Sequence, residues 1–203
     1  MQAAHRWPDR NLSRLELVIA FVIILALIGL FMRHMYIVFA EAEQSMVNGT
    51  VNNINSALKY QALFYLMKED YRDLADLAAV NPMDAMQGNQ MNRLLSGGTI
   101  SSKQVGTEYR SIIKPGNYIG AFDDPDPSEL GKGVWYYDTG RRLLVYIIRN
   151  TEFFSSDLGG VPRLRFRIEV EYEDTDGNGV FDPPVDKYRS VHISCLDHYE
   201  WTI

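Results

Sequence analysis

The chain has 203 residues, which suffice for one globular domain and an anchor but not for two well-formed cores. Its net charge of −6 gives no electrostatic reason to expect a nucleic-acid partner, so DNA and RNA are set aside. The single cysteine, Cys195, excludes an internal disulfide and a cysteine-based zinc site. It lies in an alternating apolar run, where we expect a small core residue.

Residues 15–39 form an apolar stretch that is long enough to cross a bilayer. No charged residue occurs from Leu17 to Met32, although Glu16 stands near the start, where an unpaired charge is costly in lipid. The sequence predicts one transmembrane helix here, preceded by a basic tail over residues 1–14. A cleavable secretory signal is the competing interpretation, but no small-residue cleavage site follows the run.

The charges on either side of the span predict its orientation. Three arginines against one aspartate give +2 before Leu15, and since the whole chain carries −6, the remainder carries −8. By the positive-inside rule, the basic tail is cytoplasmic and the acidic remainder lies on the other side. In a bacterium this predicts a single-pass inner-membrane protein with a periplasmic domain.

The helix is expected to continue beyond the membrane over residues 40–68. Apolar residues recur there at steps of three and four, which is typical of a helix that packs on a sheet. Glycine inside a helix costs about 1 kcal/mol relative to alanine, so we expect a bend at Gly49. The stripe consists of Val47, Val51, Ile54, Leu58, Ala62 and Tyr65.

Residues 69–203 are predicted to complete a periplasmic domain of α+β class. A short helix should end before Asn81-Pro82, and strand-like patterns begin near Ile100. Residues 135–148 are typical of a hairpin whose second strand is unbroken and apolar, as in a central strand covered on both faces. We therefore predict a long N-terminal helix packed on an antiparallel β-sheet.

The next strand, residues 163–173, alternates without error between apolar and charged residues. Leu164, Phe166 and Ile168 belong to the face that turns inward, whereas arginines followed by glutamates face outward. The outward face is either a solvated surface with cross-strand charge pairs or a docking surface for a neighbouring subunit.

Residues 174–186 contain oxygen ligands with part of the spacing of a calcium loop. The match to an EF-hand is incomplete, because the twelfth position is Val185 instead of glutamate. A plain turn rich in aspartate, asparagine and glycine is the alternative. A second metal site in the proline-rich stretch 118–133 is a weaker alternative to a solvated surface loop. The proposed Ca²⁺ ligands are Asp174, Asp176, Asn178, Asp182 and Asp186.

The arrangement of tail, span, helical spine and sheet resembles the type IV pilins and pseudopilins. In that family, glutamate occupies the fifth position of the mature chain, and "LSRLEL" places Leu12 first and Glu16 fifth. The resemblance implies that Glu16 neutralises the N-terminal amine of a neighbouring subunit within the membrane. The sequence departs from the family at Asn11, where the leader peptidase requires glycine, and at the third position, which is Arg14.

Within that family, "NPMDAM", "GNYIGAF" and "GVWYYDTGRRLLVYIIRN" most resemble minor, MshF-like proteins of MSHA-type (mannose-sensitive haemagglutinin) pilus biogenesis. The resemblance implies a non-enzymatic component whose partners are other pilin-like subunits and inner-membrane assembly proteins. No small-molecule substrate is expected, since the sequence lacks recognisable catalytic motifs. A membrane-anchored periplasmic sensor or enzyme domain and a calcium-dependent adhesive tip protein are the alternatives.

Overall fold

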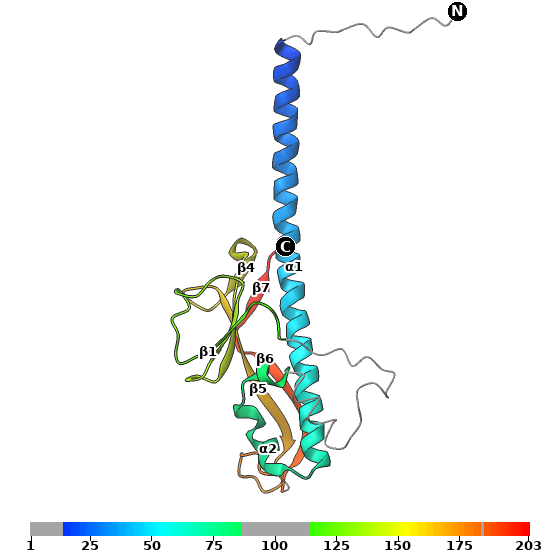
Figure 1. Cartoon of the computed structure of the whole chain (residues 1–203), viewed down its shortest axis with the longest axis vertical. Helices are drawn as coiled ribbons and strands as arrows, with labels where there is room; N and C mark the ends of the chain where they lie inside the picture. Colours follow the sequence, from blue (N-terminus) through cyan, green and yellow to red (C-terminus); the bar gives the residue numbers. More distant parts are fainter. Residues whose placement is uncertain (1–13, 87–113, 184) are drawn as a thin grey trace, which may run out of the picture.

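A computed structural model describes residues 14–86, 114–183 and 185–203. Its longest element is α1 (Arg14–Met67), an unbroken helix of 54 residues. Figure 1 shows that the first half of α1 stands clear of the domain, while the second half lies along it. The prediction of one continuous helix is confirmed, and Gly49 lies inside it without interrupting the helical backbone.

The two halves of α1 differ in burial. The apolar side chains from Leu15 to Phe39 are exposed or half-buried, and Ala40 is the first fully buried residue. Beyond it the predicted stripe packs on the domain, with Val47, Ile54 and Leu58 at 2% exposure or less. The prediction of a helix that is bare over one half and buried over the other is confirmed, whereas the exact membrane boundaries stay predictions.

Short helical segments follow α1 and lie against it. The turn after α1 places Glu69 at a φ of 56°, and Asp70 then caps α2 (Tyr71–Asp76) by accepting from the amide of Asp73. A 3₁₀ turn, η1 (Leu77–Ala79), ends the predicted second helix. An additional turn, α3 (Pro82–Ala85), begins where we expected only a break, because Asn81 caps it and proline is well suited to a first helical position.

The domain contains a five-stranded sheet and a small two-stranded sheet. The large sheet has the order β1-β2-β3-β5-β6, and β4 pairs with β7 in the small one. A second 3₁₀ turn, η2 (Thr151–Phe153), leads into β4. The strands are β1 (Tyr118–Phe122), β2 (Trp135–Asp138), β3 (Leu143–Ile147), β4 (Phe154–Ser156), β5 (Arg163–Glu173), β6 (Lys187–Cys195) and β7 (Tyr199–Trp201).

The large sheet is mixed, because β1 runs parallel to β2 while the other pairs are antiparallel. The prediction that residues 118–122 belong to a surface loop was wrong, since they form β1. The proline-rich residues 123–134 are long enough to carry the chain back to the starting end of β1, which a parallel pair requires. The α+β class is confirmed, and the sheet is antiparallel apart from this edge strand.

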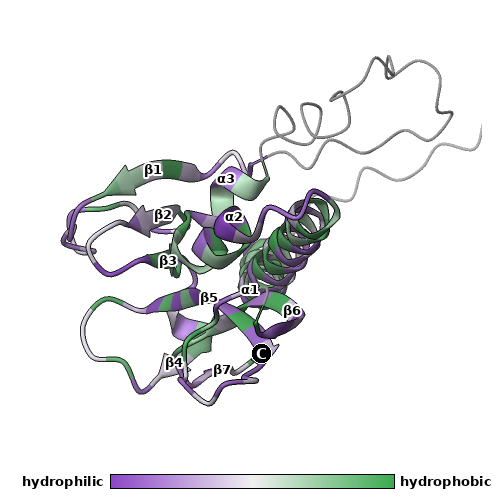
Figure 2. Cartoon of the chain, turned by 90° about the horizontal axis from the view of Figure 1, so that it is seen from below, coloured by the Kyte–Doolittle hydropathy of each residue, from purple (hydrophilic) through white to green (hydrophobic). Residues whose placement is uncertain are grey.

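The core lies between the sheet and the helical layer of α1, α2 and η1 (Figure 2). A smaller cluster covers the other face of the hairpin and contains Tyr136, Leu143, Val145 and Ile147. The hairpin prediction is therefore confirmed, and β3 is a central strand whose five residues are all buried.

The register of β5 agrees with the alternation of its sequence. Leu164, Phe166 and Ile168 are buried, and the outward residues pair with β6 and the chain that follows it. Glu173 lies 3.3 Å from Arg189, and Arg165 forms an ion pair of 2.6 Å with Asp197. The outward face thus has the cross-strand pairs of a solvated surface.

Candidate functional site

The exposed half of α1 carries most of the large apolar side chains that are exposed in the described chain. It is long and apolar enough to span a membrane, and none of its most apolar window is buried in the protein. Arg14 opens the helix, and Glu16 lies exposed in its first turn. Asn11 and Leu12, the predicted leader junction, lie outside the described residues.

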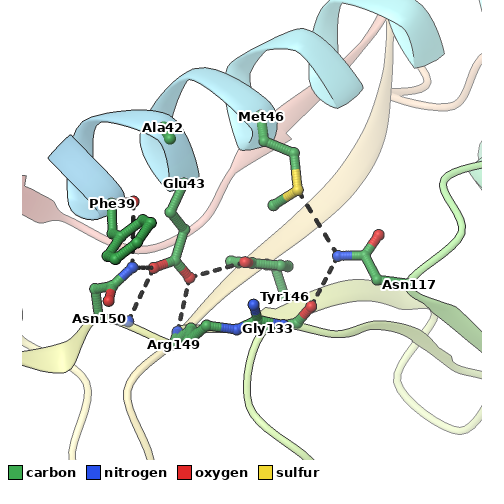
Figure 3. A pocket seen from close by; sticks show the side chains of 9 residues that line it. All are labelled: Phe39, Ala42, Glu43, Met46, Asn117, Gly133, Tyr146, Arg149 and Asn150. Atoms are coloured by element: carbon green, nitrogen blue, oxygen red, sulfur yellow. Dashed lines mark hydrogen bonds between the residues drawn. The ribbon is translucent and has the colours of Figure 1, made fainter. Parts of the chain in front are cut away.

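A buried carboxylate joins α1 to the sheet where the helix meets the domain. Glu43 is 6% exposed, and its Oε1 accepts from the Tyr146 hydroxyl at 2.8 Å and from the Arg149 amide at 2.7 Å. Its Oε2 accepts from the amide and side-chain nitrogens of Asn150 at 2.8 and 2.7 Å (Figure 3). Asn150 also donates to the Phe39 carbonyl at 3.3 Å. One side chain of α1 thereby binds the end of β3 through four hydrogen bonds.

Sequence reasoning did not identify this junction, although a signal for it was present. Glu43 lies three residues after Ala40 and four before Val47, so it extends the buried stripe of α1 with a charged residue. A carboxylate on an apolar face requires donors, because a buried charge without them is strongly unfavourable. The donors lie in the second strand of the hairpin and just after it, more than one hundred positions later, which no local pattern indicates.

A cavity of about 460 Å³ opens beside this junction, between α1 and the ends of β2 and β3. Phe39, Met46 and Tyr146 supply apolar walls (Figure 3). Arg149 contributes to the rim, and its guanidinium rests on Gly133. A Cβ at Gly133 would lie 2.6 Å from the Arg149 Nε, a contact that the flexible arginine side chain can relieve by moving. The φ of Gly133 is +75°, so the backbone conformation is what favours glycine there.

The acidic loop 174–186 brings three of the predicted calcium ligands together. Carboxylate oxygens of Asp174, Asp176 and Asp186 lie within 4.8 Å of one another. Asn178 and Asp182 lie beside this group, joined to each other by a 3.2 Å hydrogen bond. The group lies in the loop that connects the end of β5 to the start of β6. The sequence predicted the candidate ligands in this loop.

Hydrogen bonds within the loop fix these carboxylates. Asp174 accepts from the amides of Gly177 and Gly179, and these bonds, above all the one from Gly179, lower the pKa of its carboxyl. Asp186 is 4% exposed and accepts from the amides of Thr175 and Asp182. Asp174 is therefore held in its ionised form.

The pKa of the Asp182 carboxyl is shifted in the opposite direction. Partial loss of hydration raises the pKa of its carboxyl, and the neighbouring Asp186 and Asp176 raise it further. Its Oδ1 is enclosed without a hydrogen-bond partner in the described structure. A divalent cation would relieve this crowding of negative charge, and carboxylate and amide oxygens are ligands that Ca²⁺ prefers. The assignment of these five residues as metal ligands stays a prediction.

Comparisons with protein families, with curated proteins and with solved structures find no match for this chain. The class of protein is therefore defined by the architecture alone. A long apolar N-terminal helix, bare over one half and packed on a β-sheet over the other, is a pilin-like layout.

Proposed function

We propose that this chain is a non-enzymatic, pilin-like component of a type IV pilus or a related secretion filament. It is anchored in the bacterial inner membrane, with its N-terminus in the cytoplasm and its domain in the periplasm. It acts by packing its N-terminal helix against the helices of other pilin-like subunits and by contacting inner-membrane assembly proteins. Its particular resemblance is to the minor, MshF-like proteins of MSHA-type pilus biogenesis.

One observation carries this proposal. The first half of α1 exposes apolar side chains around its whole circumference, whereas the second half belongs to the core of the domain. A helix that is apolar all round is stable only when lipid or other helices surround it. The rigid continuation into the domain would then fix the domain relative to a bundle of such helices.

Glu16 and Arg14 are the residues to which we assign assembly. A carboxylate in the membrane is tolerable when it is paired with a cation, and the N-terminal amine of a neighbouring subunit is such a partner. If the chain is cut between Asn11 and Leu12, its own amine becomes available to the next subunit. If the chain is not cut, Arg14 or the N-terminal amine of a partner protein is the cation that pairs with Glu16.

Replacement of Glu16 tests this assignment. The Glu16→Ala variant should insert into the membrane as well as the wild type, because it removes a charge from lipid, yet it should co-purify with fewer pilin-like partners. Glu41→Ala is the matched control, since Glu41 is an exposed glutamate of the same helix beyond the apolar run. Unchanged co-purification of partners with Glu16→Ala would contradict the pairing role.

The acidic loop favours a second candidate function, that of a calcium-dependent adhesive tip protein. Its support is the convergence of Asp174, Asp176 and Asp186 at the end of the β5–β6 hairpin, where a bound Ca²⁺ would make the loop rigid. Deletion of the gene separates the two functions. Loss of pili indicates a role in assembly, whereas normal pili that no longer adhere indicate a tip protein.

A further inference from the structure

We infer that the cavity beside the Glu43 junction binds the headgroup of an anionic phospholipid, with Arg149 as the residue that contacts its phosphate. This inference rests on the proposed membrane anchoring of α1. It adds a defined lipid site at the point where the helix leaves the bilayer.

The position of the cavity along α1 is the first argument. About 20 helical residues cross the hydrocarbon core of a bilayer, so within the predicted span 15–39 a hydrocarbon-crossing segment that starts with the uncharged run at Leu17 ends near Tyr36. Phe39 lies one turn further along and forms a wall of the cavity. The cavity therefore begins in the layer that lipid headgroups occupy.

The chemistry of the lining is the second argument. Phe39, Ala42 and Met46 form an apolar flank along α1, which suits the glycerol backbone and the first methylenes of a lipid. On the opposite rim, Arg149 is exposed, and within the described residues no carboxylate forms an ion pair with its guanidinium. A guanidinium matches the geometry of a phosphate and binds it with two hydrogen bonds.

The structure also holds the backbone of Arg149 in place. Its guanidinium rests on Gly133, whose amide donates to the Ile147 carbonyl at 2.7 Å, and the Arg149 amide is bound by Glu43. The carboxylate of Glu43 is the negative group of the cavity, and its four donors already satisfy it. The rim of the cavity thus carries a guanidinium without an ion pair among the described residues, at the height along α1 where anionic headgroups would lie.

Native mass spectrometry of the full chain in lipid nanodiscs tests this inference. The nanodiscs contain phosphatidylcholine with or without phosphatidylglycerol, and the measurement counts the lipids that remain bound to the released protein. Both lipids carry a phosphate, but phosphatidylcholine also carries a quaternary ammonium whose positive charge would lie near the Arg149 guanidinium. We therefore expect the wild type to retain phosphatidylglycerol about tenfold over phosphatidylcholine. Arg149→Gln should abolish this preference.

Arg167→Gln is the matched control, because Arg167 is an exposed arginine on the outward face of β5, and it should retain the preference. Equal retention of the two lipids by the wild type, or an unchanged preference in Arg149→Gln, would overturn the lipid site. Tight binding of inorganic phosphate without retention of lipid would also overturn it. A chain that does not enter the nanodisc would instead refute the proposed anchoring itself, and the lipid site with it.

Discussion

Replacement of Glu43 should detach α1 from the sheet at the membrane-facing end of the domain. Glu43→Ala removes the acceptor of four hydrogen bonds and leaves the hydroxyl of Tyr146 and the amides of Arg149 and Asn150 without a protein partner. Each unsatisfied buried donor costs about 1–3 kcal/mol, and water entering from the cavity replaces part of the loss. We expect the free energy of unfolding to fall by about 3–5 kcal/mol, a large share of the stability of a single domain.

Two related variants provide reference values for this loss in the free energy of unfolding. Tyr146→Phe removes one donor and leaves the other three bonds of Glu43 intact, so it should cost about 1–2 kcal/mol. Glu41→Ala removes an exposed glutamate from the same helix and should change the free energy by less than about 0.5 kcal/mol.

The assay is urea unfolding of the full chain in detergent micelles, followed by tryptophan fluorescence, since Trp135 is fully buried in the core. Amide hydrogen exchange supplies a local readout, and the amides of Arg149 and Asn150, which follow β3, should lose protection in Glu43→Ala before the amides of β3 do. A Glu43→Ala variant as stable as Glu41→Ala, with both amides still protected, would refute the reasoning.

Three further predictions concern other parts of the chain. Burial, and then the hydrogen bond to Glu43, raise the pKa of Tyr146, so the stability that its neutral phenol contributes is complete below pH of about 10 and is lost as pH rises toward the folded pKa. Alkaline urea titrations should therefore show a smaller loss of stability in Tyr146→Phe than in the wild type, and equal losses would contradict this. Millimolar Ca²⁺ should raise the melting temperature of the full chain, and Asp174→Asn or Asp186→Asn should abolish the increase; calorimetry without any binding at that concentration would refute the metal site. The intact mass of the protein from its own host should lack residues 1–11 if the Asn11–Leu12 junction is cut, in which case the chain is a filament subunit, and should retain them if it is a resident membrane component that works beside the fibre.

The helices and central strands were predictable because their patterns are local. The stripe from Val47 to Tyr65 has the period of a helix, and the alternation of residues 163–173 has the period of a strand with one buried face. Each pattern arises because one face of the element packs on the core and the opposite face meets solvent. Such patterns suffice to predict which face of an element is buried.

The edge strand and the helix junction were not predictable in the same way. None of the residues 118–122 is fully buried, and they do not alternate between apolar and polar side chains. Their strand conformation depends on pairing with β2, which lies beyond a proline-rich loop. Glu43 depends on donors contributed by the far end of β3. Both features are set by contacts between segments distant in sequence.

The acidic loop was only partly predictable from its spacing. The pattern at Asp174 and Asp176 indicated a shared site, and Asp186 lies one position late for an EF-hand. The hairpin between β5 and β6 brings Asp186 back beside the other two carboxylates, so the geometry of the turn compensates for the spacing.

Cross-linking in the host membrane tests the central claim most directly. A photoreactive residue placed at Ile24, in the middle of the exposed half of α1, reports what surrounds the helix, and one placed at Val180, in the acidic loop, is the matched control. The proposed function predicts that Ile24 cross-links to proteins with a pilin-like apolar N-terminal helix and that Val180 does not reach such helices. Adducts of Ile24 with lipid alone, in cells that assemble the filament, would contradict it.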